Sequence, residues 1–179
     1  TIEGGAVCFG DQALSPILQE LRNFGRRDKE DCFLAGGNAK MNEFQAAMGI
    51  CNLRHISEEI AKRKAAVEHY RERLSGVNGI KLCAEQEGVA SNYAYFPVVF
   101  DGYKYNRDEV FAKLKEFDIV ARKYFYPLTN GFDCYKDLPT AGEDKTPVAK
   151  HIAYRVLTLP LFADLTMCDV DRICDIILK

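Results

Sequence analysis

One segment decides how this chain of 179 residues is organised: Gly36-Gly37-Asn38-Ala39-Lys40-Met41-Asn42-Glu43-Phe44-Gln45-Ala46-Ala47. Its first two glycines permit backbone angles that other residues avoid. Asn42 is a favourable helix N-cap, and Gln45 three residues later can complete a capping box. The segment therefore predicts a loop that ends where a helix begins, directly after Asn42.

A long helical pattern follows this loop. Apolar residues recur at spacings of three and four as far as Leu74, and Ser75-Gly76 is a natural end. The pattern fits either one continuous helix or two helices with a break near Ile56-Ser57. A helix of this length cannot bury itself against one small core, so we expect it to leave one domain and enter another. We place the boundary between residues 1–45 and residues 46–179.

The chain before this loop predicts a strand and a helix. Residues 6–9 form a short apolar run that is typical of a buried strand. Residues 14–24 repeat apolar side chains at helical spacing, and Gly25 is a natural stop. Residues 26–34 are charged and irregular, which is typical of a surface loop.

The chain after the long helix predicts a compact unit of mixed helix and strand. Residues 80–83, 94–100 and 119–126 read as strands, and residues 156–161 are a further apolar stretch. Asn106 and Thr166 are expected to cap two helices, the second of which ends the chain. This order of elements gives an α/β chain whose second part is a small α+β sandwich domain.

Composition excludes several classes of protein. The net charge is -2 and the pI about 5.9, which does not fit a nucleic-acid binder. No run of about 18 apolar residues predicts a membrane span. The seven cysteines form no CxxC pair, and the histidines have no metal-ligand spacing, so we expect no metal site. Several cysteines lie in apolar segments, which indicates core packing in a reducing, cytoplasmic environment.

Three segments together resemble the DegT/DnrJ/EryC1/StrS family of aminotransferases. They are the loop segment above, Thr1-Ile2-Glu3-Gly4-Gly5-Ala6-Val7, and Arg155-Val156-Leu157-Thr158-Leu159-Pro160-Leu161. The resemblance runs in order along nearly the whole chain. It implies the C-terminal part of a fold-type I transferase that depends on pyridoxal 5'-phosphate. The chain would then hold the end of the large domain, a bridging helix and the whole small domain.

The same resemblance implies an activity. Family members transfer an amino group, usually from glutamate, to a keto-deoxy sugar linked to a nucleotide, in polysaccharide or sugar biosynthesis. They are homodimers whose active sites use both subunits. The residues of the first two segments resemble those of family members that act on a sugar linked to deoxythymidine diphosphate. The lysine that holds the cofactor as a Schiff base is expected upstream of Thr1, so this chain alone should not catalyse the reaction.

Two residues of the loop segment are the candidates for phosphate contacts. Asn38 matches the family asparagine that hydrogen-bonds the cofactor phosphate of the neighbouring subunit, and an amide donor suits a phosphate oxygen. The alternative is an asparagine that only tolerates a left-handed turn. Lys40 matches a position near the same opening and could meet the nucleotide phosphates. The alternative is an exposed loop lysine.

Arg122, Tyr124 and Tyr126 are the candidates for sugar contacts. They alternate along a predicted strand and would share one face of it. The resemblance implies that this strand and the following loop line the sugar pocket, whereas the alternative is ordinary aromatic packing on a sheet. The family often has a histidine just after the matching proline, and this sequence has Leu128-Thr129-Asn130 there.

Two other functions remain open on the sequence. One is a non-catalytic dimerisation or binding module that has the same architecture. The other is a sugar dehydratase of the same family, in which a histidine replaces the Schiff-base lysine.

Overall fold

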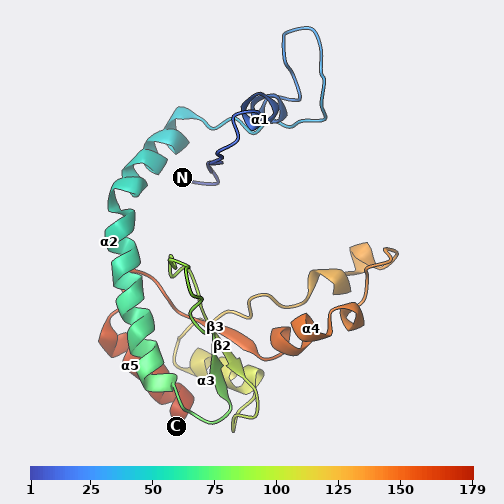
Figure 1. Cartoon of the computed structure of the whole chain (residues 1–179). Coiled ribbons are helices and arrows are strands. Elements are labelled where there is room, and N and C mark those ends of the chain that lie inside the picture. The colour runs from blue at the N-terminus through green and yellow to red at the C-terminus, as the bar shows by residue number, and fades with distance from the viewer. The chain divides into compact units, whose positions relative to one another are not determined.

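The computed structural model describes residues 1–179, which form two compact units, Thr1–Ser57 and Glu58–Lys179. Helix α2 (Glu43–Leu74) is continuous over 32 residues and contributes to both units (Figure 1). The sequence left open a break near Ile56-Ser57, and the structure shows none. None of the helices is both long enough and apolar enough to cross a membrane.

The start of α2 confirms the predicted capping box. The Gln45 backbone amide donates to Asn42 Oδ1 at 2.9 Å, and Gln45 Oε1 accepts from the Asn42 amide at 3.1 Å. The Gln45 side-chain amide also donates to the Ile2 carbonyl at 2.8 Å. The cap therefore fixes the first turn of the helix and ties the N-terminal segment to it.

The first unit also contains helix α1 (Leu14–Arg22). Gly25, at a φ of +74°, lies so close to Leu34 that a Cβ would meet its carbonyl oxygen at 1.6 Å, which explains the glycine. The predicted strand at residues 6–9 is wrong, because this segment has no strand partner and is exposed. An apolar run becomes a strand only where a second strand completes its hydrogen bonds.

The second unit is built on a three-stranded antiparallel sheet in the order β1-β2-β3. Its strands are β1 (Ile80–Leu82), β2 (Phe96–Phe100) and β3 (Val156–Leu159). Three helices join it: α3 (Arg107–Glu116), α4 (Pro147–Ala153) and α5 (Met167–Leu178). Three short 3-10 helices, Thr129–Gly131, Asp133–Tyr135 and Glu143–Lys145, lie between α3 and α4.

The core of this unit lies between the sheet, the C-terminal half of α2, and helices α3 and α5 (Figure 1). Each helix contributes apolar residues at helical spacing, and β2 buries alternate residues. Its largest fully buried side chains include Tyr70, Leu74, Leu114, Leu157, Leu159 and Ile177. Burial of apolar surface is the main force that holds the unit together.

Two further expectations for this unit are corrected. The predicted strand at 119–126 is limited to one bridge between Arg122 and Thr158, because the Arg122 carbonyl also accepts the Tyr124 amide and the chain turns there. The cysteines do not pack in the core as expected: Cys174 is buried and the other six are exposed. Helical spacing places a cysteine on a face of a helix but does not say which neighbour covers that face.

Candidate functional site

The Thr1–Ser57 unit fixes the backbone of Asn38 against the end of α1. Gly37 donates its amide to the Leu21 carbonyl, and Ala39 donates to the Arg22 carbonyl, both at 3.0 Å. Asn23 and Asn38 form an isolated antiparallel bridge. Asn38 is exposed, so its side-chain amide can meet a partner from outside the unit. The loop therefore presents this amide from a position that main-chain hydrogen bonds hold.

A left-handed turn does not explain this asparagine. The non-glycine residues with positive φ are Ile2, Glu3, Phe24, Tyr93 and Asp118, and Asn38 is not among them. The alternative interpretation of Asn38 as a residue that only tolerates such a turn is therefore contradicted.

Lys40 lies beside the same bridge. Its ammonium donates to Asn23 Oδ1 at 3.0 Å and lies 4.4 Å from the centroid of the Phe24 ring. These contacts hold an exposed cation near the residue that pairs with Asn38. An amide and an ammonium are both donors that suit phosphate oxygens, so the groups present here fit a phosphorylated ligand.

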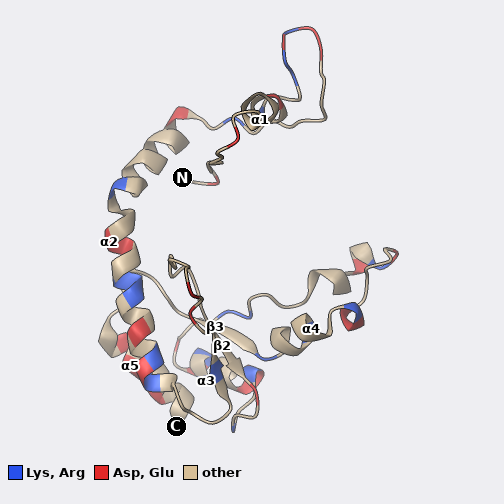
Figure 2. Cartoon of the chain, viewed as in Figure 1, with Lys and Arg blue, Asp and Glu red and all other residues tan.

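The surrounding loop adds charges of both signs, as Figure 2 shows next to α1. Glu20 is 6% exposed, and Arg27 neutralises it through Nε at 2.6 Å and Nη2 at 3.4 Å. This contact with Glu20 raises the pKa of Arg27. Because Glu20 is paired, its carboxylate does not cancel the positive charge of Lys40.

The three sugar-contact candidates lie in the Glu58–Lys179 unit, around one hollow of about 470 Å³. The predicted alternation along a strand is wrong, since only Arg122 pairs with the sheet. The turn at Tyr124 nevertheless brings all three side chains to this hollow. It is lined by Phe111, Ala121, Arg122, Lys123, Tyr124, Phe125, Tyr126, Pro127, Thr129 and Phe132.

Aromatic rings and one guanidinium give this hollow its chemistry. The Arg122 guanidinium donates to the Tyr124 hydroxyl and lies 5.4 Å from the centroid of the Tyr124 ring. The Tyr124 ring stacks on Phe125 at 4.8 Å and meets Tyr95 edge to face at 5.7 Å. Such a surface can hold a sugar ring or a base by its faces and a phosphate by the guanidinium.

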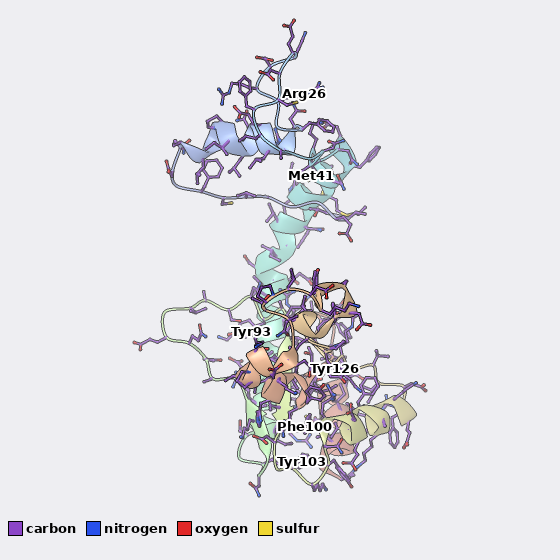
Figure 3. The ribbon with its side chains drawn as sticks, turned by 90° about the vertical axis from the view of Figure 1, so that its right-hand side faces the viewer. Arg26, Met41, Tyr93, Phe100, Tyr103 and Tyr126 are labelled. Atoms are coloured by element: carbon purple, nitrogen blue, oxygen red, sulfur yellow. The ribbon has the colours of Figure 1, made fainter.

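Tyr126, which Figure 3 labels, has other neighbours than Arg122 and Tyr124. The Arg107 guanidinium carbon lies 4.7 Å from the centroid of its ring, and the Tyr154 ring meets it edge to face at 5.1 Å. None of Arg107, Tyr95 and Tyr154 was predicted from the sequence to belong to a site. Arg107 had one usable signal, because the predicted cap at Asn106 places it at the first position of a helix, where a cation is unfavourable.

The loop after Tyr126 is held by the side chain of Asn130. Asn130 donates its side-chain amide to the Gly142 carbonyl at 2.8 Å and to Thr146 Oγ1 at 3.1 Å. It therefore ties the loop to the start of α4, and the Thr146 hydroxyl makes no capping bond to that helix. No group of three or more His, Cys, Asp and Glu side chains could hold a metal ion.

Comparisons with known proteins agree on one family. An Escherichia coli protein named dTDP-4-amino-4,6-dideoxy-D-glucose transaminase is 38% identical over 177 residues, which are 98% of this chain and 48% of that protein. The crystal structure of S. venezuelae DesV matches with a TM-score of 0.83 and 27% identity, over 94% of this chain and 44% of that one. DesI, solved in the presence of its TDP-sugar product, matches with a TM-score of 0.80 and 30% identity, over 93% and 42%.

The chain thus spans about half the length of the curated relatives it matches. The structural neighbours confirm the expected fold, the C-terminal part of such an aminotransferase. The model of the DegT/DnrJ/EryC1/StrS aminotransferase family matches residues 1–178. A match over this range shows that the chain belongs to the DegT/DnrJ/EryC1/StrS aminotransferase family.

Proposed function

We propose that the chain is the C-terminal part of an enzyme that transfers an amino group from glutamate to a keto-deoxy sugar linked to deoxythymidine diphosphate. The enzyme depends on pyridoxal 5'-phosphate and acts as a cytoplasmic homodimer in polysaccharide or sugar biosynthesis. Residues 1–45 complete its large cofactor-binding domain, and residues 46–179 form the bridging helix and the small domain.

The observation that carries this proposal is the 38% identity, over 98% of this chain, with a protein named as a dTDP-sugar transaminase. A second relative of that name is 34% identical. These names favour amino transfer over sugar dehydration. They also favour an enzyme over a non-catalytic binding module.

In this proposal Asn38 and Lys40 bind phosphate groups. Asn38 donates its amide to the cofactor phosphate of the partner subunit, and the main-chain hydrogen bonds of Gly37 and Ala39 hold the backbone on either side of it. Lys40 attracts the diphosphate of the substrate as a point charge. Pyridoxal phosphate, when bound, supplies an electron sink that lets the amino-bearing carbon lose a proton.

Arg122, Tyr124 and Tyr126 hold the sugar. Their rings give apolar faces for the sugar ring, and the Arg122 guanidinium and tyrosine hydroxyls give donors for its oxygens.

The test uses the intact protein that contains this chain, with pyridoxal phosphate, glutamate and the dTDP-linked 4-keto-6-deoxyglucose. Mass spectrometry should detect equal amounts of the amino sugar nucleotide and 2-oxoglutarate. A product that has lost water without gaining nitrogen would identify a dehydratase. The absence of any product with keto-sugar nucleotides would defeat the proposal. Residues 1–179 alone should form no product, because they span only about half the length of the related transaminases.

A further inference from the structure

Arg107 occupies a position that is energetically unfavourable for a cation. It is the first residue of α3 and only 2% exposed. The N-terminus of a helix carries partial positive charge, and removing a guanidinium from water adds a large desolvation cost. An apolar residue of similar volume would fill this space without either cost. The contacts of the guanidinium must therefore indicate what it does.

Those contacts join three separate segments. Nη1 donates to the Ala153 carbonyl at the end of α4, at 3.0 Å. Nε lies 2.8 Å from Asp108 Oδ1, in the first turn of α3. The guanidinium lies over the ring of Tyr126, with 4.7 Å from its carbon to the ring centroid. One planar group thus links α3, α4 and the segment of residues 121–127.

Beyond Arg122, that segment is held by the buried Ala121 and by side-chain contacts of Lys123, Tyr124 and Tyr126. Lys123 forms an ion pair with Asp108, the same carboxylate that Arg107 contacts. The edge of the Tyr126 ring meets Tyr154, whose hydroxyl donates to Glu143 Oε2 at 3.0 Å. The Tyr126 ring therefore contacts Arg107 at its face and meets the Tyr154 ring at nearly a right angle.

We propose that Arg107 is a positioning residue for nucleotide-sugar binding: it holds the Tyr126 ring, and with it the wall of the hollow, in the binding orientation. The inference rests on the proposed function, because it assigns the sugar to that hollow. Arg107 acts through Tyr126, since the guanidinium lies behind the ring and is itself buried. A lysine cannot replace it, because an ammonium has no plane to stack and no fork to bind Asp108 and Ala153 together.

The test is Arg107→Lys in the intact enzyme, which keeps the charge and removes the planar fork. We expect KM for the keto-sugar nucleotide to rise about tenfold with a much smaller change in kcat, as for a loss of ground-state binding. The KM for glutamate should not change, since the amino donor does not use this wall. A rise in both KM values together, or in neither, would overturn the inference.

The matched control is Arg73→Lys. Arg73 pairs with two carboxylates, Asp171 and Asp175 on α5, and not with residues 121–127. Both variants should lose thermal stability, but only Arg107→Lys should change KM for the sugar nucleotide. If Arg73→Lys raised KM for the sugar nucleotide as much as Arg107→Lys does, Arg107 would have only a structural role.

A double-mutant cycle asks whether the effect passes through Tyr126. If it does, Arg107→Lys adds little to the KM of Tyr126→Leu, and the fold-changes do not multiply. Carbon-13 spectra of tyrosine rings give a readout that needs no activity: Arg107→Lys should shift Tyr126 and Tyr154 and leave Tyr70 unchanged. An unshifted Tyr126 signal overturns the inference even in an inactive enzyme, whereas an inactive wild type defeats the proposed function alone.

Discussion

Gly79 lies directly against the backbone of Tyr103: a Cβ at Gly79 would meet the Tyr103 amide nitrogen at 2.1 Å. Gly76, three residues earlier, has nearly the same backbone angle, with a φ of +76° against +80°. Its surroundings are open, with nothing within 4 Å of a Cβ. Both glycines therefore have a left-handed backbone. Only at Gly79 is there also no room for a side chain.

This pair separates backbone strain from steric contact. Gly76→Ala should lower the free energy of unfolding by about 1 kcal/mol, the cost of a left-handed backbone for alanine. Gly79→Ala should cost about 1–3 kcal/mol more, because the backbone at Tyr103 must move. Urea denaturation followed by circular dichroism measures both. Equal losses would show that the approach to Tyr103 is not tight.

Asp101 should make stability depend on pH in the acid range. Lys81 donates to its carboxylate at 2.6 Å and His151 at 3.2 Å, and these contacts lower its pKa from 3.8 to about 2. Because the folded pKa is the lower one, unfolding takes up a proton between these values. The stabilisation is complete above about pH 4 and is lost as pH falls towards about 2.

The comparison that isolates this carboxylate is wild type against Asp101→Asn. The difference in their free energies of unfolding should be constant from pH 6 to about pH 4 and then shrink towards about pH 2. Urea titrations at each pH measure it. A difference that stays constant down to pH 2 would rule out the linkage.

Asn106 should contribute to stability through its cap on α3. Its side chain accepts from the Asp108 amide at 2.9 Å and from the Glu109 amide at 3.0 Å. Asn106→Ala should cost about 1 kcal/mol, and Asn106→Ser should cost much less because serine is also a good cap. Thermal unfolding ranks the two variants. If both lose the same stability, the cap is not the cause.

Tyr70 allows its hydroxyl and its ring to be tested separately. The hydroxyl donates to the Pro160 carbonyl at 3.0 Å, and the ring stacks on Phe96 with centroids 4.9 Å apart. Tyr70→Phe keeps the ring and should cost about 1 kcal/mol. Tyr70→Ala also leaves a cavity and should cost about 3–5 kcal/mol. A Tyr70→Phe variant as unstable as Tyr70→Ala would show that the hydrogen bond dominates.

The role of Asn38 across a dimer can be tested by mixing two inactive subunits of the intact enzyme. One carries Asn38→Ala, and the other lacks the Schiff-base lysine. If Asn38 serves the partner subunit, each hybrid dimer has one complete site, so random mixing should restore roughly one quarter of the sites. Activity at limiting pyridoxal phosphate measures this. No recovery in a mixture shown to contain hybrids would place Asn38 in its own subunit's site or in none.

Local signals in the sequence predicted much of the fold. The caps at Asn42, Asn106 and Thr166 mark the starts of α2, α3 and α5, and the apolar spacing of α5 matches its buried face. These signals work because a cap and a helical stripe involve residues only a few positions apart. The predicted strands at 6–9 and 119–126 failed, because a strand depends on a partner that is distant in sequence.

The candidate sites divide in the same way. Asn38 and Lys40 were found through a sequence resemblance, since they belong to one short continuous segment. Arg122, Tyr124 and Tyr126 were predicted to share one face of a strand, whereas a turn brings them to one hollow. Arg107 was missed, because its burial and its contact with Tyr126 join residues that are far apart along the chain.

The sequence by itself determined the family, the long helix after Asn42 and the capped ends of the helices, because each follows from neighbouring residues. Only the tertiary structure decided which cysteine is buried, where the sheet ends beside Thr158, and which cation supports the Tyr126 ring. The physical reason is that burial and stacking depend on which distant segments pack together, and local periodicity does not specify those contacts.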